Sequence, residues 1–373
     1  MKYRFSLFCL ISAICISQAA AQGIREVSKV PYNWSSVPIV GGGFVDGIVL
    51  HPNDKNVRFC RTDMGGAYRW DSQDQKWIAM QDDLSLADSN LQGVESIAVD
   101  PQDSRSVYLA CGTYTSNRNT AICYSRDGGL TFTRVDVPFT MGGNENGRGN
   151  GERMMVDPVN GDIIYMGTRM HGLWRSTDRG ESWQRVDSFP DVTEKIGGND
   201  WQSWNNRGSG IITIIYDTVE SVEGRGCRHI YAAVSLMGRE SLFASHDFGE
   251  SWNAVEGQPV SLRPTHMVMG SDRMLYITYA DTPGPSQMTD GAVWAYDMKK
   301  GKWNDISPIK VKKGEKGIKI IAPAPYKKMV EELTHCNEYV DDLFSNDGIK
   351  LNNVKIESDI EGRVSIIADG IDP

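Results

Sequence analysis

Short apolar strands separated by polar turns fill the chain between about residues 34 and 307. In each unit an apolar stretch ends in Asp-Pro or His-Pro, as at residues 97–101 and 155–158, and a second apolar strand follows, as at residues 107–110. Short apolar runs bounded by turn residues are typical of buried strands, and no convincing long amphipathic helix interrupts them. The pattern therefore predicts an all-β protein built from repeated units.

A turn motif, Ser-x-Asp-x-Gly-x-x-aromatic, closes the units. The serine hydroxyl and aspartate carboxylate can accept backbone N–H groups that a tight turn leaves unpaired, and the glycine accepts a positive φ. These aspartates are therefore expected to be structural rather than catalytic. The three clear copies contain Ser125, Asp127 and Gly129; Ser176, Asp178 and Gly180; and Ser245, Asp247 and Gly249.

Two degenerate copies, ending at Trp77 and Trp303, extend the series to five units. Two strands around a proline turn followed by a hairpin give four strands per unit, which is one blade of a β-propeller. We expect consecutive four-stranded blades from about residue 31 to 307. The closing aromatics Phe132, Trp183 and Trp252 should be largely buried at equivalent places, where they can pack between neighbouring sheets.

The two ends of the chain differ from this central region. Lys2 and Arg4, an apolar run over residues 5–16 and three alanines at 19–21 are typical of a secretory signal peptide, so residues 1–21 predict a secreted, periplasmic or cell-surface protein. All ten tryptophans lie between Trp34 and Trp303, and the segment that follows is rich in lysine. We therefore place the propeller in residues 22–308 and expect residues 309–373 to be an unrelated segment, small α/β or irregular, that packs separately.

Composition narrows the range of partners. A net charge of −9 argues against nucleic acid as the main partner, and no later segment is long and apolar enough to suggest a membrane partner. Five cysteines remain after the leader without metal-ligand spacing, so neither a metal nor a cofactor is expected. Cys111 and Cys123 could face each other across a hairpin, although buried free thiols are the favoured interpretation.

Two motifs outside the turn repeats could carry chemistry. Residues 61–70, Arg-Thr-Asp-Met-Gly-Gly-Ala-Tyr-Arg-Trp, place Asp63 at the end of a strand and before Gly65 and Gly66. Residues 142–153 form a polar, glycine-dense loop that contains Arg148 and Glu152, and such loops often bind ligands. From spacing alone, Asp63 is equally consistent with a residue that caps a turn.

These motifs resemble the opening of glycoside hydrolase family 74. The resemblance also rests on residues 32–34 (Tyr-Asn-Trp), 41–44 (Gly-Gly-Gly-Phe), 47–52 and 172–178, and it is dense from about residue 31 to 307. It implies hydrolysis, with inversion, of β-1,4-glucans such as xyloglucan, in a cleft between two seven-bladed propellers. Asp63 matches the family's general base, whereas the general acid is an aspartate of the second propeller.

The resemblance also implies a substrate-binding set, and the absent side chains of its two glycines would let a sugar approach the backbone. We expect Asp63 to lie on the ligand-facing side, with one oxygen open to solvent and no arginine ion pair. The implied substrate-binding residues are Gly65, Gly66, Tyr114, Arg148, Glu152, His171 and Trp201.

The match ends near residue 308, so about five blades of the seven-bladed template are present. No residue here corresponds to the general acid, and we expect the chain alone to be nearly inactive, with exposed blade edges that favour association. Residues 312–326 faintly resemble a stretch of antirestriction-type proteins of mobile elements.

Two other functions stay open. A non-catalytic carbohydrate-binding propeller could stack sugars on Trp201 and Trp204, although the sequence is equally consistent with packing of these indoles in the core. A sialidase shares the turn motif, but it would need an arginine cluster and a Tyr/Glu pair that cannot be assembled from this sequence.

Overall fold

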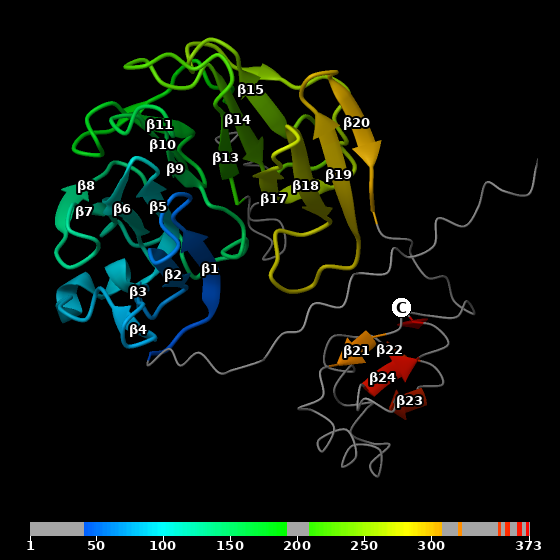
Figure 1. The fold of residues 1–373 in the computed structure, drawn as a ribbon, viewed down its shortest axis with the longest axis horizontal. Helices are drawn as coiled ribbons and strands as arrows, with labels where there is room; N and C mark the ends of the chain where they lie inside the picture. The colour runs from blue at the N-terminus through cyan, green and yellow to red at the C-terminus, as the bar shows by residue number, and fades with distance from the viewer. Residues whose placement is uncertain are drawn as a thin grey trace, which may run out of the picture. The chain divides into compact units, whose positions relative to one another are not determined.

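The computed structural model describes residues 41–191 and 209–307, together with short strands between residues 320 and 372. The first two ranges contain five antiparallel sheets of four strands, each built from consecutive strands in chain order (Figure 1). The predicted all-β propeller of about five blades is therefore confirmed. The predicted signal peptide and the indoles of Trp201 and Trp204 lie outside the described residues.

The strand bounds of the first three blades are as follows. Blade 1 contains β1 (Val45–Leu50), β2 (Arg58–Thr62), β3 (Ala67–Asp71) and β4 (Lys76–Ala79). A 3-10 helix, η1 (Leu86–Gln92), precedes blade 2, which contains β5 (Val94–Asp100), β6 (Asp103–Cys111), β7 (Ala121–Ser125) and β8 (Thr133–Asp136). Blade 3 contains β9 (Met154–Val156), β10 (Ile164–Gly167), β11 (Leu173–Ser176) and β12 (Gln184–Arg185).

The remaining strands complete two more blades and two small sheets. Blade 4 contains β13 (Ile211–Asp217), β14 (His229–Val234), β15 (Leu242–Ser245) and β16 (Asn253–Ala254). Blade 5 contains β17 (Arg263–Met269), β18 (Met274–Ala280), β19 (Gly291–Asp297) and β20 (Lys302–Asp305). Beyond it, one sheet joins β21 (Ile320–Ala322), β24 (Val364–Ile367) and β23 (Lys355–Ser358), and another joins β22 (Lys350–Leu351) and β25 (Ile371–Asp372).

The three turn motifs form the same hydrogen bonds. In the first, the Ser125 hydroxyl lies 2.6 Å from Asp127 Oδ1 and accepts the Gly129 N–H at 2.9 Å. The turns at Ser176 and Ser245 repeat both contacts, and the third residue of each set has a φ between 81° and 86°. Because these contacts lie within five residues, the motif alone determines the hairpin geometry.

The closing aromatics pack in the apolar clusters between successive blades. Phe132 packs in the cluster shared by blades 1 and 2, Trp183 in that of blades 2 and 3, and Trp252 in that of blades 3 and 4. Trp252 is 5% exposed, whereas Phe132 and Trp183 are only partly buried. The three aromatics thus occupy equivalent places and none is in the exposed class, as expected, although their burial is unequal.

Blades 1 and 5 also carry apolar side chains outside these clusters. Val49 packs against the cluster between blades 1 and 2, so its neighbours Ile48 and Leu50 point to the opposite face, where they are 63% and 61% exposed. On β17, Met267 is buried against blade 4 and Val268 is 54% exposed. These exposed faces are consistent with an incomplete propeller.

Trp252 should contribute strongly to stability because its indole fills the contact between blades 3 and 4, with ring centroids 5.2 Å from Phe189 and 6.1 Å from Tyr165. Trp252→Ala should lower the free energy of unfolding by about 3–5 kcal/mol. Leu130→Ala, at a side chain that is 65% exposed, should change it by less than about 0.5 kcal/mol. Urea unfolding followed by circular dichroism measures both, and equal effects would contradict this packing.

Candidate active site

Asp63 lies in a tight turn between β2 and β3. The Thr62 N–H donates to the Gly66 carbonyl at 3.1 Å, and the Thr62 hydroxyl accepts the Gly65 N–H at 2.8 Å. Gly66 has a φ of 85°, in the region that favours glycine. The turn therefore fixes the backbone of Asp63 at the end of a strand, as its motif predicts.

A glycine loop, residues 41–43, lies directly on this turn. The Phe44 N–H donates to Asp63 Oδ1 at 2.8 Å, and a Cβ on Gly65 would lie 1.7 Å from the Gly42 carbonyl oxygen. The close approach of two backbone segments thus explains Gly65. The expected space for a sugar at Gly65 is instead occupied by the protein's own loop, whereas a Cβ on Gly66 would find its nearest neighbour, Gln81, at 3.5 Å.

Arg148 brings its guanidinium to the Asp63 carboxylate. Its Nε lies 3.4 Å from Asp63 Oδ2 and 3.8 Å from Asp46 Oδ1, and its guanidinium carbon lies 5.6 Å from the centroid of the Phe44 ring. The Asp63 side chain is 8% exposed. The expectation that Asp63 avoids an arginine ion pair is therefore wrong, because the loop over residues 142–153 brings Arg148 to its turn, and little of the Asp63 side chain is exposed.

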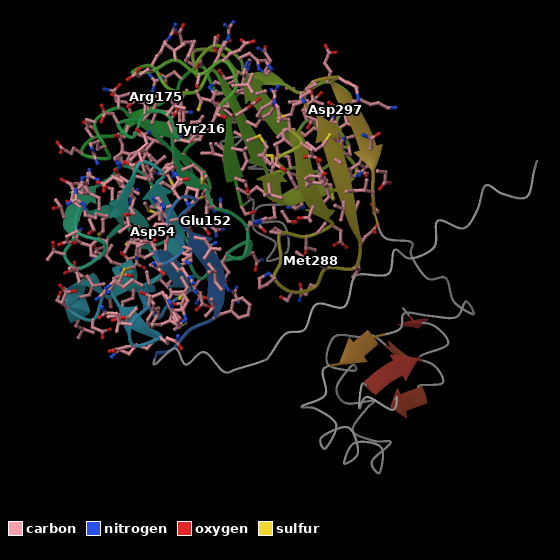
Figure 2. All side chains as sticks on the ribbon, in the orientation of Figure 1. Asp54, Glu152, Arg175, Tyr216, Met288 and Asp297 are labelled. Carbon is pink, nitrogen blue, oxygen red and sulfur yellow. The ribbon has the colours of Figure 1, made fainter. Side chains whose placement is uncertain are left out.

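Glu152, which is labelled in Figure 2, connects that loop to the first two blades through hydrogen bonds. Its Oε1 accepts from Arg61 Nε at 2.8 Å, and its Oε2 accepts from the Ser96 hydroxyl at 2.7 Å and the Ile97 N–H at 2.8 Å. Arg61 also donates to two carbonyls of the loop, those of Arg148 and Asn150. Both carboxylate oxygens of Glu152 are thus engaged inside the protein, so the side chain positions the loop.

A second buried ion cluster supports the same loop. Glu95 accepts from Arg169 and from the Gly142 N–H, and Arg153 Nε lies 3.1 Å from its Oε1. Arg169 also donates to the carbonyls of Gly142 and Asn146. Burial opposes ionisation of Glu95, but Arg169 and Arg153 outweigh it and hold the pKa of this carboxyl below its usual value.

Blade 3 repeats the turn that carries Asp63. Residues 62–66 read Thr-Asp-Met-Gly-Gly, and residues 168–172 read Thr-Arg-Met-His-Gly. The Thr168 hydroxyl accepts the His171 N–H at 2.9 Å, and the Thr168 N–H donates to Gly172 at 3.2 Å, as in blade 1. His171 therefore occupies the position of Gly65, and Arg169 that of Asp63. The five-residue repeat is a sequence signal that could have revealed this equivalence.

Tyr114 lies beside the Asp63 turn. Its phenolic oxygen accepts from Asn144 Nδ2 at 2.8 Å, and the same nitrogen lies 3.6 Å from the Met64 sulfur. Tyr114 and Met64 are 44% and 52% exposed. The structure thus brings Asp63, Arg148 and Tyr114 to one region. Glu152 instead bonds to blades 1 and 2 and holds the 142–153 loop in place.

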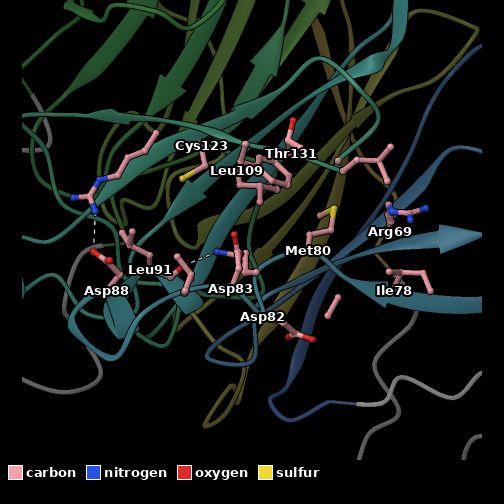
Figure 3. Close-up of a pocket in the computed structure, with 17 residues that line it drawn as sticks. Arg69, Ile78, Met80, Asp82, Asp83, Asp88, Leu91, Leu109, Cys123 and Thr131 are labelled. Carbon is pink, nitrogen blue, oxygen red and sulfur yellow. Dashed lines mark hydrogen bonds and ion pairs between the residues drawn. The ribbon is translucent and has the colours of Figure 1, made fainter.

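A separate hollow lies between blades 1 and 2 (Figure 3). It measures about 590 Å³ and is lined by Met80, Leu91 and Cys123 among others. None of the predicted catalytic or substrate-binding residues lines it, although Gly129 of the first turn motif does. Cys123 and Cys111 are buried free thiols, and no group of three or more potential metal-ligating side chains occurs among the described residues. In the same described part of the chain, no helix has the length and apolar character needed to cross a membrane.

Comparison with known proteins extends the sequence resemblance. The chain is 40% identical to a xyloglucanase of Acetivibrio thermocellus over 314 residues, which cover 83% of this chain and 37% of the relative. It is 38% identical to an oligoxyloglucan-reducing end-specific xyloglucanase of Emericella nidulans, over 79% of this chain and 35% of the relative. No family model matches.

Solved structures give the same result. The family 74 xyloglucanase from Xanthomonas campestris is 43% identical, with a TM-score of 0.68 over 80% of this chain and 42% of that one. A family 74 enzyme from Niastella koreensis is 39% identical, with a TM-score of 0.65 over 73% of this chain and 38% of that one.

The repeated four-stranded sheets define a β-propeller, with a carboxylate-bearing turn on its first blade. Within that class, the sequence and structural matches confirm the resemblance to glycoside hydrolase family 74. The chain spans about 37% of the length of the first curated relative that it matches.

Glu95 should be essential for stability because two buried guanidinium groups depend on it. Glu95→Gln should lower the free energy of unfolding by about 3–5 kcal/mol, since it leaves Arg153 and Arg169 without their counter-charge. Asp74→Asn, which breaks an exposed pair with Lys76, should cost at most about 1 kcal/mol. Urea unfolding at neutral pH compares the two variants, and a similarly small loss in both would contradict a structural role for the cluster.

Proposed function

We propose that this chain forms part of a secreted glycoside hydrolase directed at xyloglucan, with Asp63 as the general base. The single observation that carries the proposal is the constrained Asp63 turn in a chain that is 40% identical to a named xyloglucanase. The turn holds the carboxylate at a strand end beside the exposed Tyr114, and phenol rings pack well against sugar faces.

The proposed chemistry requires a second carboxyl group. In an inverting glycosidase, one carboxylic acid protonates the leaving oxygen while a carboxylate about 6.5–9.5 Å away activates a water molecule. We propose that this acid comes from outside the present chain, and that the chain alone is nearly inactive. Arg148 would need to move or share its contact for a water molecule to reach Asp63 Oδ2.

One observation favours a second candidate, a carbohydrate-binding propeller without catalysis. Asp63 is 8% exposed and lies 3.4 Å from Arg148 Nε, whereas Tyr114 and Met64 beside it are open to solvent. A surface of this kind can bind a sugar without a reactive carboxylate. Binding and hydrolysis therefore need separate measurements.

The test fuses the remaining part of a family 74 relative after the fifth blade and measures release of reducing ends from xyloglucan. Asp63→Asn should reduce the rate by at least about 100-fold, because it removes the base, while oligosaccharide binding persists. Its melting temperature should change by no more than about 4 °C, since the amide oxygen can still accept the Phe44 N–H.

Asp74→Asn, on the exposed β3–β4 turn, is the matched control and should keep full activity. Proton NMR of the first-formed product should show the inverted anomer. An Asp63→Asn fusion that stays active would exclude the base role. Binding that is lost in Tyr114→Ala, without hydrolysis in any fusion, would instead support the carbohydrate-binding propeller.

A further inference from the structure

The first strands of the blades share an irregularity near their starts. In four of the five described blades, the pairing with the second strand shifts by one residue, which marks a β-bulge. Bulges direct the extra side chain away from the regular alternation and are common beside active sites. The extra residues are Asp46 in β1, Glu95 in β5, Ile212 in β13 and Thr265 in β17.

Two of these equivalent positions carry carboxylates, but their surroundings differ. Glu95 is matched by two arginines and a backbone N–H. The Asp46 side chain is equally buried, at 0% exposed, yet neither of its oxygens has a hydrogen-bond partner among the described residues. The nearest cationic atom is Arg148 Nε, at 3.8 Å. The bulge thus places a carboxyl that has no hydrogen bonds within the described residues beside Arg148, the arginine that also contacts Asp63.

Four arginines and four carboxylates lie in this region, so their charges balance in number, but their contacts are unevenly distributed. Arg61 is engaged by Glu152, and Arg153 and Arg169 are engaged by Glu95. Among the described residues, Arg148 is the only arginine within 4.0 Å of either aspartate, so the two carboxylates share one close counter-charge. An uncompensated buried charge is costly, and a carboxyl in this position takes up a proton instead.

Asp46 is the carboxyl that keeps the proton. Within the described part of the chain, Asp46 lacks a hydrogen bond such as the one that Asp63 accepts from the Phe44 N–H, and it lies farther from Arg148 Nε, so its buried charge is the less compensated of the two. Burial raises the pKa of Asp46 to about 7; Arg61 and Arg148 oppose the rise, and Asp63 and Glu152 add to it. Other titratable groups nearby, among the described residues, are Glu95 with Arg153 and Arg169, and His266 on β17, which interacts electrostatically with Glu152 and Arg61.

We infer that Asp46 is a positioning residue of the Asp63 site: it carries a proton near neutral pH and thereby leaves Arg148 as the counter-charge of Asp63 alone. When Asp46 releases this proton to solvent at higher pH, two carboxylates compete for one guanidinium. The position of Arg148 over Asp63 then changes with pH. The consequence for hydrolysis rests on the proposed function, whereas the proton on Asp46 and its effect on Arg148 do not.

The direct test is a carboxyl titration of the full chain labelled with ¹³C-aspartate, followed by NMR. One aspartate resonance should titrate near pH 7, and it should be absent from Asp46→Asn. The exposed Asp83 supplies the matched control, and Asp83→Asn should keep that resonance. If all aspartates titrate below about pH 5, or if the neutral titration persists in Asp46→Asn, the inference is overturned.

A second readout separates positioning from a merely structural role. The ¹⁵N resonance of Arg148 Nε should shift with the same midpoint in the natural chain and in Asp83→Asn, and it should stay constant in Asp46→Asn. An Arg148 signal that does not respond to pH in the natural chain would overturn the positioning role.

Thermal unfolding provides a check that needs no assignment. The folded pKa of Asp46, about 7, exceeds its ordinary value of 3.8, so folding favours the protonated form. The stabilising contribution of that proton is present at low pH and is lost as pH rises from about 4 to 7. The melting temperature of Asp46→Asn should therefore rise relative to that of the natural chain between about pH 4 and pH 7. Above pH 7 the difference between the two melting temperatures should stay constant.

The fusion enzyme distinguishes failure of this inference from failure of the proposed function. In the natural fusion, kcat should change with pH near pH 7. This pH dependence should be absent from the Asp46→Asn fusion and should persist in the Asp83→Asn fusion. If no fusion hydrolyses xyloglucan while the NMR titration is lost in Asp46→Asn, the proposed function fails and the assignment of the proton to Asp46 stands. If an active Asp46→Asn fusion keeps the change of kcat near pH 7, the effect of Asp46 on the reaction is overturned.

Discussion

The buried ion cluster of Glu95, Arg153 and Arg169 determines where the candidate site is built. Glu95 comes from the bulge of blade 2, Arg153 precedes β9, and Arg169 follows β10, so the cluster joins two blades. Arg169 and Glu95 also bind both polar groups of Gly142, at the start of the 142–153 loop. That loop carries Arg148 to Asp63. The energetic cost of burying three charges is offset only while all three are present.

Much of the fold follows from local sequence, whereas the site depends on long-range contacts. The serine and aspartate of each hairpin motif bond to groups within the same turn, so their pattern predicts the structure. The unequal burial of Trp183 and Trp252 depends on the neighbouring blade and is not visible in the motif. Likewise, the Asp63 turn could be predicted, but the contact with Arg148 could not, because these residues are far apart in the sequence.

The carboxylates Asp46 and Glu95 were missed for a related reason. A bulge is created by the register between two strands, and no single segment encodes it. The sequence does contain one sign of these two bulges. In both β1 and β5 an acidic residue directly follows the valine that begins the strand, as Val45-Asp46 and Val94-Glu95. That signal has meaning only after the blades have been aligned with one another.

The internal repeat explains how one backbone supports opposite electrostatic roles. The Thr-x-Met-x-Gly turn holds Asp63 in blade 1 and Arg169 in blade 3, with the same backbone bonds to the threonine. Arg169 completes a cluster in which two cations share one carboxylate, whereas Asp63 joins one in which two carboxylates share one cation. The first cluster is held together by ion pairs between Glu95 and the two arginines. The second binds a proton on Asp46 near pH 7, whereas burial lowers the pKa of Arg153 in the first only to about 9, so the two clusters respond to different ranges of pH. The same turn therefore supports one cluster that changes its charge near neutral pH and another that keeps its charge there.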